Sequence, residues 1–241
     1  GCLHGRLAFN SALMPLQALF GYQYIFGVEL HSVNGFAGFV LLSWAVVSMH
    51  VWKDGRIRIS DALKVVCVFY MYMIVKDISS PSTDLLAVGI VIYVLTKWLE
   101  LVETGQKDIS YYIYLCFFAL YAMTLKLSCA FLLVIAVYPL VILIKDRCYK
   151  LMGQSLVIGF GIILLFLIRN VVLSGWLLYP VPFMDVFSVD WKLPLEKVIR
   201  EKDEITAWAR VLNDVGKLDW KVSQWFPVWF QAIGRLWRKV F

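Results

Sequence analysis

Long apolar runs separated by short, charge-bearing connections are the feature that most constrains this chain. Six of these runs are long enough, or nearly so, to cross a hydrocarbon core of about 30 Å as tilted helices. Because lipid offers the backbone no hydrogen-bonding partner, helices are the structure that such runs can form in a bilayer. The expected spans are residues 33–52, 59–76, 82–100, 110–126, 129–145 and 151–170.

The composition excludes a soluble globular domain. Of the 241 residues, 61% are hydrophobic and 17% are charged, whereas soluble domains contain about 45–50% apolar and about 25% charged residues. A soluble domain of this size could not bury so much apolar surface. The sequence therefore predicts an all-α fold, that of a polytopic α-helical membrane protein with about six transmembrane helices and further interfacial helices on the outer face.

The basic residues predict the topology. Loops 50–58, 97–109 and 145–150 together contain eight lysines and arginines, and the alternate connections contain three. The positive-inside rule places the first three loops in the cytoplasm and the other connections and the tail outside. The net charge of +6 is spread between apolar runs rather than gathered in one patch, so we expect no nucleic-acid partner.

Three regions follow from these patterns. Residues 1–32 are expected to form an outer-face interfacial segment, residues 33–170 the transmembrane helical bundle, and residues 171–241 an extracytosolic, interfacial, Trp-rich tail. The sequence has no initiator methionine and stops within an amphipathic stretch. We therefore expect an internal piece of a longer protein, with a truncated tail.

Common catalytic and metal motifs are missing from the sequence. The three histidines are scattered without metal-ligand spacing, and the five cysteines form no Cys-x-x-Cys pair. There is no phosphate loop, dinucleotide fingerprint or Gly-x-Ser-x-Gly. No metal ligand set is visible, and the sequence leaves the cofactor unknown.

Three charged residues share one predicted depth. Asp84, Lys126 and Arg169 belong to different spans, and each lies at the outer end of its span. Two cations and a carboxylate at that level could bind an anionic lipid headgroup, because arginine and lysine both suit phosphate oxygens. The alternative is that Lys126 and Arg169 only snorkel, extending their charged ends to the membrane interface, while Asp84 stabilises the start of a helix.

The segment 169–194 combines proline corners with aromatic rings and carboxylates. Rings can stack on a sugar, and carboxylates can accept hydrogen bonds from its hydroxyls. The alternative is an interfacial aromatic belt with turn-forming aspartates. The candidate sugar-pocket residues are Tyr179, Asp185, Asp190 and Trp191, and Trp176 supplies a further ring.

Several short motifs together resemble those of a known family. HGRLAFNSA, SSPSTDL, TLKLS, RNVVLSGWLLYP, VDWKLP and ITAWAR resemble a family of uncharacterised bacterial multi-pass membrane proteins. That family is in turn similar to the GT-C glycosyltransferases, which use polyprenyl-phosphate-linked sugars at the outer face of the membrane. The resemblance implies a protein of the bacterial inner (cytoplasmic) membrane that moves a sugar in cell-envelope glycan synthesis.

The resemblance also implies site residues. In GT-C enzymes an acidic residue of the first extracytosolic loop acts as catalytic base or divalent-metal ligand, and here that loop is expected upstream of Gly1. The catalytic residue is therefore unknown, with Asp84 as a candidate. Outer-end cations would contact the lipid phosphate, which implies Lys126 and Arg169, with His4 and Arg6 on the same face.

Two other functional classes remain open. A transporter or flippase of a lipid-linked or small substrate predicts polar residues at mid-depth and a broken helix at the substrate site. A non-catalytic membrane scaffold predicts that substitutions of Asp84, Lys126 and Arg169 have no effect, even jointly.

Overall fold

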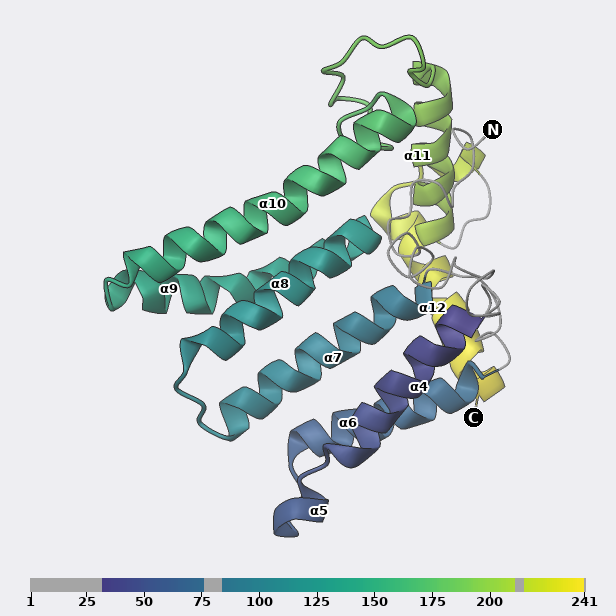
Figure 1. Cartoon of the computed structure of the whole chain (residues 1–241). Coiled ribbons are helices and arrows are strands. Elements are labelled where there is room, and N and C mark those ends of the chain that lie inside the picture. Colours follow the sequence, from purple (N-terminus) through teal and green to yellow (C-terminus); the bar gives the residue numbers. More distant parts are fainter. Residues whose placement is uncertain (1–31, 76–83, 211–214, 241) are drawn as a thin grey trace. The chain divides into compact units, whose positions relative to one another are not determined.

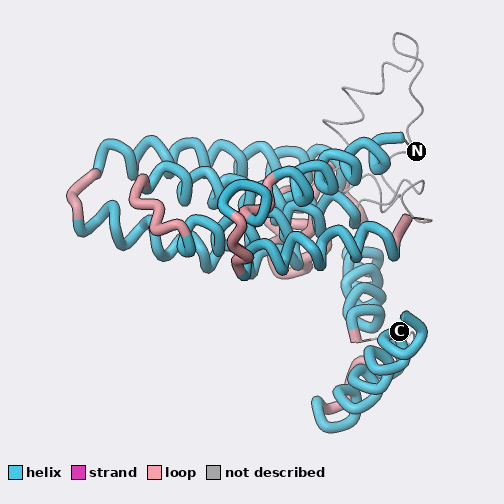
Figure 2. The backbone as a smooth tube through the Cα atoms, turned by 90° about the horizontal axis from the view of Figure 1, so that it is seen from below, coloured by secondary structure: helices cyan, strands magenta, loops and turns pink. Residues whose placement is uncertain are grey.

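The computed structural model describes residues 32–75, 84–210 and 215–240, and the regular structure in these ranges is entirely helical (Figures 1 and 2). The predicted all-α fold is therefore confirmed for this part of the chain. The predicted outer segment 1–32 lies almost wholly outside the described residues. The elements are α4 (Ser32–Val47), α5 (Val51–Asp54), α6 (Ile59–Met73), α7 (Asp84–Glu103), α8 (Ile109–Leu125), η2 (Leu127–Ala136), α9 (Val137–Lys145), α10 (Tyr149–Ser174), α11 (Leu195–Ala209), η3 (Val215–Lys217) and α12 (Val222–Val240).

Within the described ranges, four helical stretches are long and apolar enough to cross a membrane. They are Asn34–Asp54, Asp84–Glu103, Leu127–Lys145 and Tyr149–Ser174. Helix α8 is apolar but shorter, with 17 residues, and α6 has 15 residues, which is about 22 Å of helix. These apolar helices are those of a multi-pass membrane protein in a lipid bilayer.

The described residues divide into two compact units, of which the first ends at Phe166 and the second begins at Leu167. In the first unit, α7 packs against α4, α6 and α8, and α8 packs against η2. Its apolar core includes Ala87, Val94, Tyr112 and Leu132. The small residue Ala119 is also fully buried, which lets neighbouring helices approach closely.

The consecutive helices α6, α7 and α8 run in alternating directions (Figure 1). The Glu103 carboxylate at the end of α7 accepts hydrogen bonds from the amides of Ile59 and Ser60 at the start of α6. Lys126, directly after α8, contacts Asp84 at the start of α7. The bundle therefore has two polar ends, one at Glu103 and the other at Asp84.

The predicted span 129–145 is not one continuous α-helix. Residues Leu127–Ala136 form a 3₁₀-helix, and the α-helix begins only at Val137. Pro139 consequently lies in the first turn of α9, where a missing N–H group costs no helical hydrogen bond. The position of Pro139 accounts for the start of α9. The 3₁₀-helix before it has 10 residues, which is longer than is usual for a 3₁₀-helix.

Candidate functional site

The predicted site residues fall into three groups. His4 and Arg6 lie outside the described residues. Asp84 and Lys126 belong to the first compact unit. The remaining residues, Arg169, Tyr179, Asp185, Asp190 and Trp191, belong to the second unit.

Asp84 and Lys126 form an ion pair across 42 positions of sequence. The Lys126 ammonium nitrogen lies 2.8 Å from Asp84 Oδ1, and the lysine and aspartate side chains are 39% and 52% exposed. Asp84 opens α7, while Lys126 follows α8 in an extended conformation, φ −148° and ψ 116°. The structure therefore joins two of the three predicted headgroup residues at one end of the bundle, with the cation still accessible.

Arg169 lies on α10, near its carboxyl end, and is partly buried. The neighbouring Asn170 and Ser174 are buried, and the Ser174 hydroxyl donates to the Asn170 carbonyl at 2.7 Å. This bond is the usual one by which a helical serine satisfies its hydroxyl through the preceding turn. The guanidinium therefore belongs to a helix end that carries further polar groups.

The segment after α10 closes on itself. The amide of Leu193 donates to the Ser174 carbonyl at 2.9 Å, and the Trp176 indole donates to the Leu193 carbonyl at 2.9 Å. Gly175 sits at the turn with φ +75°, and a Cβ there would lie 2.8 Å from Lys192 Cα. Only glycine fits this left-handed turn, where the backbone at Gly175 lies very close to the backbone at Lys192.

The predicted sugar-pocket residues have different surroundings. Lys192 forms an ion pair with Asp185 and donates to the Phe187 carbonyl. Trp191 is exposed, although its indole donates to the Val171 carbonyl at 3.3 Å. Tyr179 is half-buried and Asp190 is exposed. Asp185 is therefore engaged by a neighbouring lysine, whereas Asp190 and Trp191 face outward.

Trp176 does not offer an open ring. Its side chain is 1% exposed, and the Lys192 ammonium lies 4.6 Å from the ring centroid. A cation over the face of a buried indole is a favourable contact. The ring therefore anchors the closed segment and cannot stack on a sugar in this arrangement.

A second polar cluster, which the sequence analysis did not predict, lies at the opposite end of the bundle. Lys64 on α6 is fully buried, and its ammonium donates to the Ser48 carbonyl at 2.7 Å. The same nitrogen lies 3.2 Å from Glu100 Oε2 and 3.6 Å from Asp61 Oδ1. A lysine ammonium that is buried away from water is stable only when carboxylates and carbonyls surround it in this way.

His50, which is buried, and Lys97, which is partly exposed, complete this cluster. The His50 amide donates to Asp61 Oδ1 at 2.9 Å, and the ring Nδ1 lies 3.4 Å from the same oxygen. Ring Nε2 lies 3.8 Å from Glu100 Oε1, which the Lys97 ammonium contacts at 2.7 Å. Two lysines thus balance two carboxylates, and the cluster ties α6 and α7 to the connection after α4.

Two sequence clues pointed to this cluster. Asp61 and Lys64 are three residues apart within a predicted span, so they share a helix face, and Glu100 also lies within an apolar run. Charges inside apolar runs are expensive unless they are paired.

In the part of the chain that the structure describes, no group of three His, Cys, Asp or Glu side chains is arranged to hold a metal ion.

Of three comparisons with known proteins, one gives a match. No curated protein and no solved structure matches this chain. Residues 1–241 match the family described as Domain of unknown function (DUF8201), to which the chain therefore belongs.

Proposed function

We propose that this protein is a GT-C-like glycosyltransferase, or part of one, that moves a sugar from a polyprenyl-phosphate donor in cell-envelope glycan synthesis. In this proposal all six predicted segments cross the bacterial inner membrane, with loops 50–58, 97–109 and 145–150 in the cytoplasm and the tail outside. The observation that carries the proposal is the accessible Asp84–Lys126 pair at one end of the bundle.

The position of this pair supports the proposal. The cytoplasmic loops of the predicted topology lie at the end of the bundle that holds Glu103, and Lys126 lies at the other end. A partly exposed ammonium at that level can exchange its carboxylate partner for a phosphate, because both are anions with similar hydrogen-bonding oxygens. Lys126 holds the donor phosphate in the proposed site, and Arg169, in the other compact unit, remains the second cation that the sequence predicts for it.

The transfer itself is a displacement at the anomeric carbon of the donor sugar. An acceptor hydroxyl oxygen bonds to that carbon while the bond from the carbon to the phosphate oxygen breaks. The prenyl phosphate leaves with the electron pair, and the hydroxyl proton passes to a base. Asp84 is the carboxylate that we propose for orienting the hydroxyl or accepting its proton once phosphate has taken its place at Lys126.

The 171–194 segment shapes the sugar end of the proposed site. Trp191 and Asp190 are exposed and Tyr179 is half-buried, so a ring and a carboxylate are accessible to a glycan. Asp185 contributes by holding Lys192 and keeping the closed segment in shape.

The first test measures donor binding in the purified full-length protein. We expect Arg169→Ala to weaken binding of a polyprenyl-phosphate sugar at least tenfold, because a phosphate contact is lost. Arg169→Lys should retain part of the affinity, since lysine keeps the charge but not the planar fork. Lys197→Ala, at an exposed position on α11, serves as the matched control and should leave binding unchanged.

Three outcomes contradict this proposal. Unchanged donor affinity in Arg169→Ala, with normal insertion and yield, removes the lipid-phosphate site. Normal envelope glycan in cells whose protein carries joint Asp84→Asn, Lys126→Ala and Arg169→Ala substitutions favours a non-catalytic scaffold instead. Movement of a lipid-linked substrate across vesicles without glycosyl transfer favours the flippase alternative.

A further inference from the structure

Helix α12 separates apolar from polar positions along its whole length. Because successive residues turn by about 100° around an α-helix, the aromatic positions of α12 and most of its aliphatic ones fall on one arc of about 140°. The positions on this apolar arc are Val222, Trp225, Phe226, Trp229, Phe230, Ile233, Leu236, Trp237 and Val240. The glutamines and arginines lie on the remaining circumference, so α12 has one face suited to hydrocarbon and another suited to water.

Part of the apolar arc is open to the surroundings. Val222, Phe226 and Phe230, which are four residues apart, are 64%, 47% and 66% exposed. The rings of Phe226 and Phe230 stack at 6.3 Å and extend this surface along the helix. Trp225 is half-buried, and the Arg210 guanidinium at the end of α11 lies 5.5 Å from its ring centroid. One edge of the arc therefore faces α11, while the edge with Phe226 and Phe230 is accessible.

The charges on and beside α12 all have the same sign. Residues 221–241 contain four basic residues and no acidic residue. The basic residues are Lys221, Arg235, Arg238 and Lys239, and all four positions lie outside the apolar arc. Helix α11 differs, because it has three basic and four acidic residues. Positive charge beside an apolar face is complementary to a surface that is both apolar and anionic, which is the surface of a bilayer with anionic lipids.

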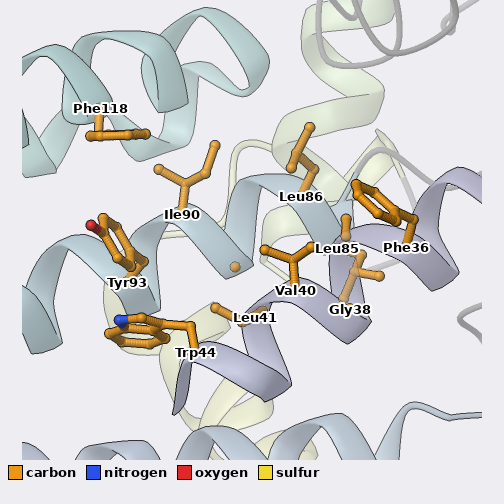
Figure 3. Close-up of a pocket in the computed structure, with 12 residues that line it drawn as sticks. Phe36, Gly38, Val40, Leu41, Trp44, Leu85, Leu86, Ile90, Tyr93 and Phe118 are labelled. Carbon is orange, nitrogen blue, oxygen red and sulfur yellow. The ribbon is translucent and has the colours of Figure 1, made fainter. Parts of the chain in front are cut away.

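This charge distinguishes α12 from the apolar groove between α4, α7 and α8 (Figure 3). None of the twelve residues that line the groove is charged. An uncharged apolar lining does not discriminate between a lipid chain, a helix of another protein and a small apolar molecule. On α12 the cations restrict the partner to one that carries negative charge next to its apolar part.

We infer that α12 lies in the plane of the membrane, with its apolar arc among the upper acyl chains and its cations at the headgroups of anionic phospholipids. The inference extends the predicted interfacial tail by assigning the face of contact and the class of lipid, and it does not depend on glycosyl transfer. Helix α10, which is long enough to span the membrane, ends at Ser174 in the same compact unit. Binding of α12 to the bilayer is therefore intramolecular and needs little intrinsic affinity.

The test compares two positions of α12 in the full chain, reconstituted in lipid nanodiscs. In a protein without other cysteines, Phe226→Cys on the apolar arc and Gln224→Cys on the opposite side each carry an environment-sensitive fluorophore. Both positions are exposed in the structure, so a helix in water gives the same emission at both. With phosphatidylglycerol present, we expect blue-shifted emission at position 226 and at least threefold stronger quenching there by doxyl-labelled lipid than at position 224. Phe230→Cys should repeat the result and guards against misfolding of one variant.

A second measurement tests the choice of lipid. We expect quenching at position 226 to fall at least threefold in nanodiscs of phosphatidylcholine alone, and also when salt is raised, because salt screens exposed charges. Joint Arg235→Gln, Arg238→Gln and Lys239→Gln substitutions should remove the difference between the two lipid compositions. The matched control, Arg235→Lys, Arg238→Lys and Lys239→Arg, keeps every charge and should keep the difference.

Three results would overturn the inference. Equal emission and quenching at positions 224 and 226 in anionic nanodiscs would show that α12 lies in water. Blue-shifted emission at position 226 without quenching by doxyl-labelled lipid would show that protein, such as a second copy of the chain, covers the apolar arc. Equal quenching at position 226 in phosphatidylcholine and phosphatidylglycerol nanodiscs would show an apolar anchor that does not recognise anionic lipid.

Discussion

Lys64 is the residue whose surroundings depend most clearly on packing between helices. It is fully buried, and its ammonium contacts are a backbone carbonyl and the carboxylates of Asp61 and Glu100. Each charge in such a group loses its hydration, so each is stable only while the others remain in place. The cluster therefore acts as a unit.

Replacing Lys64 with methionine tests this dependence. The substitution keeps most of the side-chain volume but leaves two carboxylates facing one lysine, and breaking a buried pair costs about 3–5 kcal/mol. We expect a lower free energy of unfolding of that size, measured by denaturant titration in detergent micelles. Lys53→Met, at an exposed position of the same end, should change stability little.

A second variant separates charge from packing. Adding Glu100→Gln to Lys64→Met removes the one uncompensated negative charge, so part of the lost stability should return. If Lys64→Met alone is as stable as the wild type, the buried cluster contributes nothing to the fold.

Among individual residues, the sequence predicted the Asp84–Lys126 group and did not predict the cluster around Lys64. Asp84 and Lys126 were identifiable because each charge directly adjoins an apolar run, which fixes its depth. The contacts of Lys64 with Glu100 and of Asp61 with His50 depend on which helices are neighbours, and no local pattern specifies that. The sugar-pocket prediction failed at Trp176, since residue type alone does not tell a buried ring from an exposed one.

Among the elements, the closed 175–194 segment depends on a single backbone position. We expect Gly175→Ala to destabilise it by about 1–3 kcal/mol for the left-handed backbone alone, and by more through the contact with Lys192. The observable is faster proteolytic cleavage within this segment while the helices of the bundle remain intact.

A matched glycine is available as the control for this substitution. Gly161 lies within α10, and a Cβ built there meets no atom within 4 Å. Gly161→Ala should therefore leave the cleavage rate unchanged and should favour the helix slightly. Equal cleavage of the Gly175→Ala variant and the wild type would show that the turn tolerates a side chain.

The sequence predicted the positions of the helices better than their character. Each of the six predicted runs coincides largely with observed helix, because apolar length is a strong local pattern. The 3₁₀ segment before Pro139 was not predicted, since hydropathy does not distinguish helix types. The predicted run 59–76 is longer than α6, which ends at Met73.

For the whole molecule, the separation of the two polar ends gives a test of orientation. Cys148 is exposed in the loop 145–150, which the positive-inside rule places in the cytoplasm. In a variant that keeps Cys148 and replaces the other four cysteines by serine or alanine, we expect a membrane-impermeant maleimide to label spheroplasts only after permeabilisation.

The opposite face needs its own reporter. Ser188 is exposed in the closed segment, and Ser188→Cys in a cysteine-free protein should be labelled in intact spheroplasts. Labelling of Cys148 without permeabilisation would reverse the predicted orientation. That result would also place Lys126 on the cytoplasmic side, where a donor presented at the outer face could not reach it.

The order in which the ribosome makes these helices has a consequence for membrane insertion. When α6 leaves the ribosome, its first amides and its buried lysine still lack Glu103 and Glu100, which follow about 40 residues later in the chain. A short helix with unmatched charges is a poor substrate for entry into lipid on its own. If α6 crosses the membrane as the proposed topology requires, we expect it to wait at the translocon or the membrane surface until α7 emerges, so that the two helices enter the bilayer together.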